Sequence, residues 1–183
     1  MFCRDEKVVY PGYGVATVQD IIIRYVGGNK SEFFQLKFVN KDMTILVPTE
    51  KINIVKLRKL CDEADIEQLY SFLSEPFVLH KEERMLTATW SKRYKDYQTK
   101  IQSGDVKEIC TIYRELKNLE AQKDLSFGEK SILLQTENLL AEEISIVKNC
   151  KYVISRDMIK NLVMVQLKSS GMLLSDIKQR INI

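Results

Sequence analysis

The sequence contains few of the residues from which metal sites and disulfide scaffolds are built. Among 183 residues there is one histidine, His80, and there are four widely spaced cysteines without a CxxC pair: Cys3, Cys61, Cys110 and Cys150. Because structural zinc requires clustered Cys and His ligands, we expect no metal site and no cofactor. Isolated cysteines are typical of free, mostly buried thiols in a reducing cytosol, which predicts a cytoplasmic protein.

Long uncharged apolar stretches are also missing. The first residues, MFCRDEKVVYPGYG, have no apolar core of the length that a signal peptide needs. No stretch elsewhere has the roughly 20 apolar residues that a transmembrane helix requires. We therefore expect neither export nor insertion into a membrane.

Enzyme motifs fail on inspection. The GEKS of residues 128–131 resembles the end of a phosphate-binding loop, but Glu129 separates Gly128 from Lys130, and no earlier glycine stands at the required offset. A helix cap at Ser126-x-x-Glu129 explains these residues better. We therefore expect no nucleotide-binding loop here.

Acid–base chemistry is equally unsupported. His80 could act as a general base, but no nucleophile motif accompanies it. The acidic pairs Glu82-Glu83 and Glu142-Glu143 are interpreted as solvated helix faces, because adjacent helix positions point in different directions. The sequence therefore predicts a protein that is not an enzyme.

What is present is an ordinary folded composition with an uneven charge distribution. The chain is 45% hydrophobic and 29% charged, with a net charge of +3, and its length suffices for a core without disulfides. Residues 101–147 hold 5 basic and 9 acidic side chains, whereas residues 148–183 hold 7 and 2. Any contact with nucleic acid should therefore be local rather than a general coat.

Residues 1–58 read as a β domain. Alternating, β-branched segments are separated by turn signals at 10–14 (YPGYG), 27–29 (GGN) and 40–42 (NKD), and Pro48 should end a strand or lie on an edge. We interpret YPGYG as a structural turn, with Tyr10 or Tyr13 packing over the sheet. Short strands with tight turns predict a small antiparallel barrel or half-barrel, and so an α+β chain.

Residues 59–183 read as helical. The first predicted helix starts at a capping box, Asp65-x-x-Gln68, and stops at Pro76, and the second runs from Trp90 to Ser103-Gly104. Caps at Asp105-x-x-Glu108 and Ser126-x-x-Glu129 start the next two. A helix over 156–168, a break at 169–171 and a short final helix follow. In the third helix Ile109, Cys110, Tyr113 and Leu116 should share a buried face with Val106. The sequence contains no internal repeat.

The only tryptophan of the chain stands in its most basic short window. Residues 89–97, TWSKRYKDY, surround Trp90 with Lys92, Arg93 and Lys95. One interpretation is a half-buried anchor at a domain boundary, with the cations simply solvated. The other is an exposed aromatic tip that wedges into the minor groove of DNA while the cations hold phosphates. The residues alone leave both open.

A family resemblance favours the second interpretation. VVYPGYGVATV, the GGNK hairpin, EFFQLKF and MTILVP, followed by TWSKRYKDYQTKIQSGD and the run from IYRELKN through LSFGEK to AEEIS, resemble the CarD/CdnL group of bacterial transcription regulators over about residues 5–147. The β half is the less specific part, because a similar module opens the transcription-repair coupling factor. The W-S-K-R-Y-K, S-G-D and L-S-x-G-E-K motifs in succession make the match specific.

The resemblance implies a function. Family members have a Tudor-like, RNA-polymerase-interacting domain that docks on the polymerase β subunit, and a helical domain that meets promoter DNA at the upstream edge of the melted bubble. The family's tryptophan, here Trp90, lodges in the minor groove there and stabilises the open promoter complex. Its basic neighbours Lys92, Arg93 and Lys95 would hold phosphates. A protein of this kind needs no membrane, and we favour a monomer.

For the polymerase contact, the resemblance points to Arg24 and to a docking strand, Ile45-Leu46-Val47-Pro48, suited to edge-to-edge pairing. Some relatives carry an arginine in place of Leu46, and leucine cannot form that arginine's ion pair. The resemblance says nothing of the basic C-terminal extension from about residue 148, which is either a solvated cap on the core or an auxiliary phosphate contact. The alternative function is a polymerase- or repair-factor-binding adaptor without DNA contact; a sequence-specific repressor ranks last, because no base-reading helix is evident.

Overall fold

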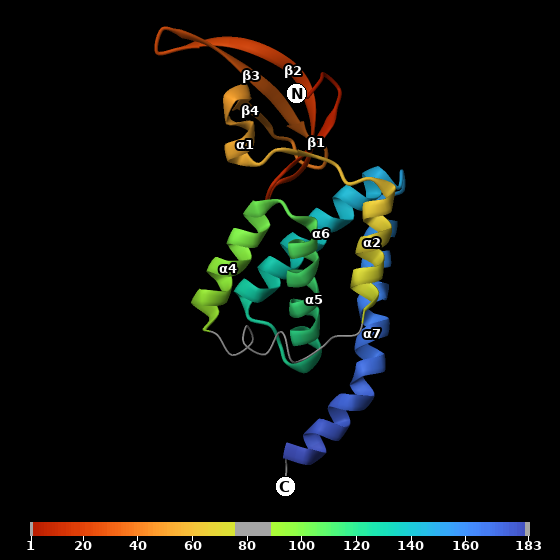
Figure 1. Cartoon of the computed structure of the whole chain (residues 1–183). Helices are drawn as coiled ribbons and strands as arrows, with labels where there is room; N and C mark the ends of the chain where they lie inside the picture. Colours follow the sequence, from red (N-terminus) through yellow and green to blue (C-terminus); the bar gives the residue numbers. More distant parts are fainter. Residues whose placement is uncertain (1, 76–88, 182–183) are drawn as a thin grey trace.

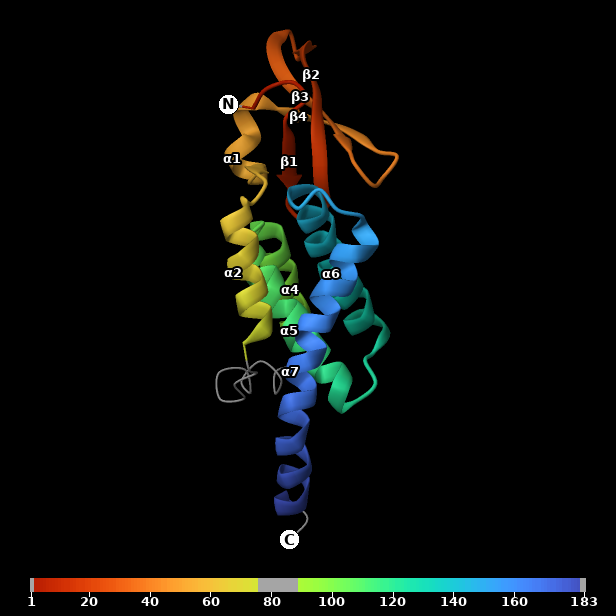
Figure 2. The same ribbon diagram turned by 90° about the vertical axis from the view of Figure 1, so that its right-hand side faces the viewer.

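A computed structural model describes residues 2–75 and 89–181 of the chain, with side chains as far as Gln166. An N-terminal antiparallel sheet stands above a body of helices, and a long C-terminal helix runs down one side of that body (Figure 1, Figure 2). The predicted α+β class is confirmed. Pro76, His80 and the Glu82-Glu83 pair, which carried predictions, lie outside the described residues.

The sheet has five antiparallel strands in the order β4-β3-β2-β1-β5. Their bounds are β1 Lys7–Tyr10, β2 Gly14–Val26, β3 Asn29–Phe38, β4 Thr44–Pro48 and β5 Arg58–Lys59. The alternation read from the sequence is visible in β3, where Phe34, Leu36 and Phe38 are buried and the residues between them are not. Because β4 and β5 form the two edges, the sheet is open and does not close into a barrel.

The β2–β3 hairpin is much longer than the core that it covers. After a register shift between Val18 and Asp20, the strands stay paired as far as Val26 and Asn29. The distal half projects beyond the domain as an arm (Figure 1). Directly opposed residues of paired strands point to the same face of a sheet, so the register decides which side chains of the arm share a surface.

The helical part follows the short η1 (Thr49–Lys51) and α1 (Ile52–Val55). It consists of α2 Glu63–Ser74, α4 Trp90–Ser103, α5 Val106–Gln122, α6 Phe127–Val147 and α7 Tyr152–Ile181. Asp105 caps α5 and Ser126 opens α6 with a capping box, as predicted. The box of α2 was predicted in the wrong register. It begins at Asp62, whose extended backbone lets its side chain accept the amide proton of Asp65, while the Asp65 carboxylate accepts that of Asp62.

The C-terminal extension differs from expectation. No break occurs at 169–171, and α7 continues to Ile181. A glycine inside a helix costs only about 1 kcal/mol relative to alanine, so serine and glycine do not suffice to end one. The first half of α7 lies beside α2 and α6, where it buries Ile159 and Val163. This part of the extension therefore completes the helical core.

The two halves have separate cores. Nine buried residues fill the β domain, and a larger cluster fills the helical domain. The predicted inner face of α5 is confirmed, because Ile109, Cys110, Tyr113 and Leu116 are buried and Val106 packs at the edge of the same cluster. Two cores mean that a separate set of contacts must fix the domains relative to each other.

The YPGYG turn supplies part of that joint. Its glycines have the positive φ expected of them, +77° at Gly12 and +107° at Gly14, and Tyr10 and Tyr13 pack edge to face with ring centroids 5.3 Å apart. The turn also rests on the helical domain. A Cβ at Gly14 would lie 2.2 Å from a carboxylate oxygen of Glu142, so only glycine allows this approach.

The Glu142-Glu143 pair was predicted wrongly as a solvated face. Both residues of α6 are buried, with 6% and 4% of their surface exposed. The Glu143 carboxylate accepts two hydrogen bonds from the Arg58 guanidinium, at 2.6 and 2.8 Å, and a third from the Cys61 backbone at 2.9 Å. Adjacent positions are both buried because α6 passes directly under the sheet, where each meets a different part of the β domain.

The two carboxylates differ in electrostatics. Burial raises the pKa of Glu142 above its ordinary value, although the Val15 amide and the nearby Lys41 oppose the shift. Burial lowers the pKa of Arg58, but the bonds to Glu143 outweigh it and leave that pKa raised. Burial, reinforced by Glu143, raises the pKa of Cys61 to about 12, so this thiol stays protonated. Glu143 thus pairs with Arg58 at the joint, whereas burial opposes the ionised form of Glu142.

Substituting glutamine at the two neighbours should separate these roles. Glu143→Gln leaves Arg58 without its counter-ion and should lower the free energy of unfolding at pH 7 by about 2 kcal/mol, less than for a fully buried pair because Arg58 is partly exposed. Glu142→Gln should be neutral or stabilising at pH 7. A carboxyl with a raised folded pKa contributes stability below its unfolded pKa and loses it as pH rises through the folded value.

Urea denaturation of both variants between pH 4 and pH 8 checks this difference. Only the wild type and Glu143→Gln should keep the Glu142 contribution to the pH dependence. Equal losses of stability at pH 7 in the two variants would contradict the assignment.

Candidate nucleic-acid and polymerase interfaces

Trp90 is the first residue of α4, and the first turn of α6 supports its ring. The side chain is half-buried against the helical core. Its indole lies on the backbone of Gly128, where a Cβ would be 2.6 Å from Cζ2. The Tyr94 ring, one turn along α4, has its centroid 5.6 Å from the indole centroid. The residue is therefore an anchored aromatic that is partly exposed, which combines features of both interpretations drawn from the sequence.

Arg93 does not face solvent with the other cations of its window. Only 6% of its surface is exposed, and its guanidinium donates to Glu129 Oε1 at 2.6 Å. It also lies 5.6 Å from the centre of the Trp90 ring. The expectation that Arg93 holds a phosphate is therefore corrected. Three residues along a helix from Trp90, it shares the side of α4 that faces α6.

Glu129, the partner of Arg93, is fixed by the cap of α6. Its carboxylate accepts from the Ser126 amide at 2.9 Å and from the Ser126 hydroxyl at 2.8 Å. Burial alone would raise the pKa of Glu129, but the bonds from Ser126 and Arg93 lower it below the ordinary value. The carboxylate is thus an ion near neutral pH. The cap predicted at Ser126-x-x-Glu129 is confirmed, and its Glu129 also binds Arg93 on α4.

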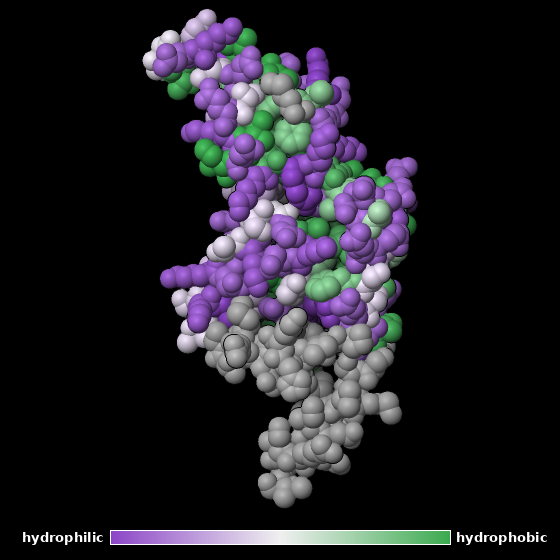
Figure 3. Space-filling view, in the orientation of Figure 1, coloured by the Kyte–Doolittle hydropathy of each residue, from purple (hydrophilic) through white to green (hydrophobic). Residues whose placement is uncertain are grey.

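The solvent side of this region is basic and aromatic. Lys92 and Lys95 are exposed on α4, whose outer surface is mostly hydrophilic in Figure 3. Tyr94 is 43% exposed, and Phe127, the first residue of α6, is 91% exposed. Phe127 was not among the predicted residues. The available signal was its helical position, which is off the buried stripe of Leu133, Leu140 and Ile144.

The predicted polymerase-binding residues divide between the two faces of the sheet. Val47 opposes the buried Phe34 and Ile45 opposes the buried Leu36, so both point into the β domain. Leu46, which opposes Gln35, and Pro48 point outward.

Arg24 belongs to the outward set. In the β2–β3 register Ile22 opposes Phe33 and Arg24 opposes Ser31, while Pro48 opposes Phe33 from the other side. Ile22, Phe33 and Pro48 therefore lie side by side on the outer face, between Leu46 and Arg24. The sequence had not identified Ile22 and Phe33, which depend on the register.

β4 presents a free backbone edge. It pairs with β3 alone among the described strands. The Phe38 amide donates to the Met43 carbonyl, so this pair is hydrogen-bonded, and pairs alternate along an antiparallel ladder. Phe34–Val47 and Leu36–Ile45 are then bonded pairs, whereas the Leu46 amide and carbonyl point away from β3. These are the groups that an added strand would meet.

Basic residues of the extension are partly neutralised within the chain. Lys148 bonds Glu67 on α2, Arg156 bonds Glu137 on α6, and Lys160 lies 3.3 Å from Glu137. Lys151 is exposed. These ion pairs and the buried side of α7 favour the core-capping interpretation over an auxiliary phosphate contact.

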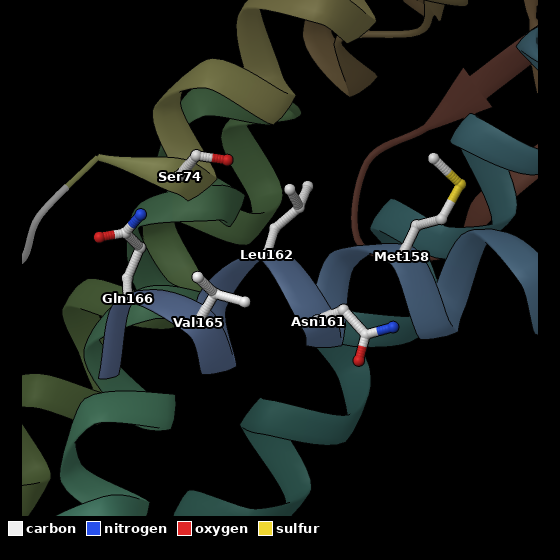
Figure 4. Close-up of a pocket in the computed structure, with 6 residues that line it drawn as sticks. All are labelled: Ser74, Met158, Asn161, Leu162, Val165 and Gln166. Atoms are coloured by element: carbon white, nitrogen blue, oxygen red, sulfur yellow. The ribbon is translucent and has the colours of Figure 1, made fainter. Parts of the chain in front are cut away.

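Other candidate sites are sparse. The described residues bring together no His, Cys, Asp and Glu group that could hold a metal ion. Of the helices in the described ranges, none is both long and apolar enough for a bilayer. An apolar groove of about 300 Å³ lies between the end of α2 and α7 (Figure 4), lined by Ser74, Met158, Asn161, Leu162, Val165 and Gln166. It shares no residue with either interface.

An open-edged sheet joined firmly to a helical body with an aromatic and basic surface defines a two-domain binding protein. Comparison with known families agrees. "CarD-like/TRCF RID domain" matches residues 2–61, and "CarD, C-terminal domain" matches residues 77–160. The chain belongs to the CarD family of RNA-polymerase-interacting transcription factors, which are not enzymes.

A bacterial protein extends this match. "Putative transcription factor YdeB" of Bacillus subtilis (strain 168) is 25% identical over 148 residues, which cover 81% of this chain and 93% of that protein. The similarity therefore runs through both domains. It places the chain beside a protein whose name assigns it to transcription.

Proposed function

We propose that the protein stabilises the open promoter complex by docking its β domain on the polymerase β subunit and wedging Trp90 at the upstream edge of the bubble. The observation that carries the proposal is the anchored, partly exposed indole of Trp90 at the start of α4, the helix that also exposes Lys92 and Lys95. An aromatic of this kind can wedge at a base step while cations hold the backbone.

The separation of the two surfaces supports this function. α4 begins at Trp90 and ends at Ser103, next to Gly104, where the helical domain meets Pro11 of the β domain. At 1.5 Å per residue, the helix places Trp90 about 20 Å from that joint. The docking strand and Trp90 therefore lie on different parts of the molecule (Figure 1), so one copy can bind both partners.

The energetics favour a melted edge over intact duplex. Unstacking a base step costs about a few kcal/mol, and a bubble edge has already lost part of its stacking. Even about 1.4 kcal/mol of preferential binding shifts the ratio of open to closed complexes tenfold. Docking on polymerase raises the effective concentration of the helical domain at the DNA, so the modest net charge of +3 is sufficient.

The adaptor without DNA contact is the alternative. It would use the same β domain, and the surface around Trp90 would bind protein instead. Photocrosslinking from position 90 to promoter DNA within the polymerase complex separates the two functions, because an adaptor gives no such crosslink while polymerase binding persists.

Removing the indole should shorten the life of the open complex. Trp90→Ala should reduce the lifetime about tenfold, since an aromatic–base contact is worth about 1–3 kcal/mol. Polymerase affinity should not change. The measurement is open-complex lifetime on one promoter after competitor challenge, with Val153→Ala, an exposed apolar position on α7, as the control. An undiminished lifetime in a folded Trp90→Ala protein would refute the wedge.

Disrupting the docking surface should abolish the effect even with Trp90 present. Arg24→Glu reverses a charge on the outer face, and Leu46→Pro removes an amide proton that points to the free edge without breaking the β3–β4 ladder. Both should weaken binding to the isolated polymerase β subunit at least about tenfold, as truncating interface groups can.

Lys30→Glu is the matched control for Arg24→Glu. It makes the same change on the same arm, but Lys30 opposes Tyr25 on the other face of the hairpin. Binding affinities from biolayer interferometry decide the outcome. If Lys30→Glu weakens binding as much as Arg24→Glu, the outer face is not the docking surface.

Salt dependence tests the phosphate contacts. Lys92→Gln with Lys95→Gln should flatten the slope of log affinity against log salt by about one to two units, at roughly 0.9 per contact on duplex DNA. Lys151→Gln, in the extension, should leave the slope unchanged. The assay is binding of a forked promoter fragment to the polymerase complex between 50 and 200 mM salt. A slope that responds only to Lys151→Gln would move the contact to α7.

A further inference from the structure

We infer that Gly128, Arg93 and Glu129 act as positioning residues that hold the Trp90 indole in its working orientation before DNA is present. The W-S-K-R-Y-K and L-S-x-G-E-K segments are then two halves of one device, which we call the Trp90 seat. This inference rests on the proposed function for its consequence, but the seat itself is a property of the free protein.

Gly128 is the residue of the Trp90 seat on which the indole packs. Its φ is not in the positive range, so the backbone of α6 does not require glycine there. Glycine is also a weaker helix former than alanine. What excludes a side chain is the indole, because a Cβ would lie 2.6 Å from Cζ2 and 3.1 Å from Cε2 of Trp90. The absence of a side chain at position 128 is therefore explained by the space that the Trp90 indole occupies.

Arg93 and Glu129 form a buried ion pair beside the indole and complete the Trp90 seat. Their side chains are 7% and 4% exposed and meet at 2.6 Å. Arg93 stands beside the indole, and Glu129 is held in turn by the Ser126 cap. A buried ion pair whose partners sit on different helices has little freedom to rearrange, since breaking it would leave an unpaired charge out of water. The pair therefore fixes the start of α4 against the start of α6.

Pre-organisation is the functional consequence. A side chain that is already ordered loses less conformational entropy when it binds. An indole packed against Gly128 and Arg93 presents its exposed part to the DNA in a single orientation. Since the seat forms during folding, its loss should be visible in the free protein, which a residue that merely contacts DNA would not show.

The chain offers a direct reporter, because Trp90 is its only tryptophan. Gly128→Ala should displace the indole, shift its emission to longer wavelength and increase its quenching by acrylamide in the full-length free protein. Ser131→Ala, at an exposed position of the same helix, is the control and should change neither. Since alanine favours a helix over glycine, the expected result is a displaced indole without unfolding.

The second readout is open-complex lifetime. Gly128→Ala should shorten it at least about threefold, within the range of coupling between touching residues. In a Trp90→Ala background the same change should have no further effect. Glu129→Gln, which keeps the shape of the side chain but removes its charge, should also increase the quenching of Trp90. It serves as the decisive variant if Gly128→Ala fails to fold.

The outcomes separate the two claims. Unchanged Trp90 emission and quenching in the folded variants would overturn the seat. Changed emission with an unchanged lifetime in Gly128→Ala, while Trp90→Ala shortens the lifetime, would overturn its functional role. If Trp90→Ala itself leaves the lifetime unchanged, the wedge fails, whereas the fluorescence still decides whether the seat exists.

Discussion

The Glu143 carboxylate joins the two halves of the molecule. Its bonds to Arg58 and to the Cys61 backbone tie α6 to β5 and to the segment that leads into α2. Beside it, Glu142 meets the YPGYG turn at Gly14. Each domain has its own core, so the angle between them is set by these polar contacts together with apolar side chains of both domains that line one small cavity, among them Val9, Val15 and Leu140. The relation between the docking strand and Trp90 depends on this angle.

From that joint, two helices set the position of Trp90 relative to the β domain. α4 leaves the joint at Gly104, and α6 crosses under the sheet at Glu142 and Glu143. At their other ends the same two helices meet again, through Arg93 and Glu129. Arg58 connects the two helices at the joint, since it donates to the Gly104 carbonyl as well as to Glu143, and the buried Arg93–Glu129 pair connects them at the other end, so their relative movement is restricted. In the proposed function, this rigidity would let polymerase docking direct Trp90 to the DNA with small uncertainty in orientation.

Local signals predicted much of this structure, and long-range contacts account for the rest. The caps at Asp105 and Ser126 and the strands follow from residue types and spacing. The burial of Glu142 and Glu143 did not, because a charged pair looks solvated until the sheet above it is known. Arg93 was misassigned for the same reason, since its partner Glu129 stands 36 residues away. The continuation of α7 through 169–171 shows that weak helix formers do not end a helix unaided.

The free edge of β4 also bears on whether the free protein self-associates. A strand that offers unpaired amides and carbonyls is a template for another copy of itself. Here the strand is only five residues long, and Pro48 at its end has no amide proton to donate. The Leu46 amide is thus flanked by a position that cannot extend a ladder. The edge is long enough to accept a partner strand held in place by a large neighbouring surface, and too short to sustain growth of a self-paired sheet.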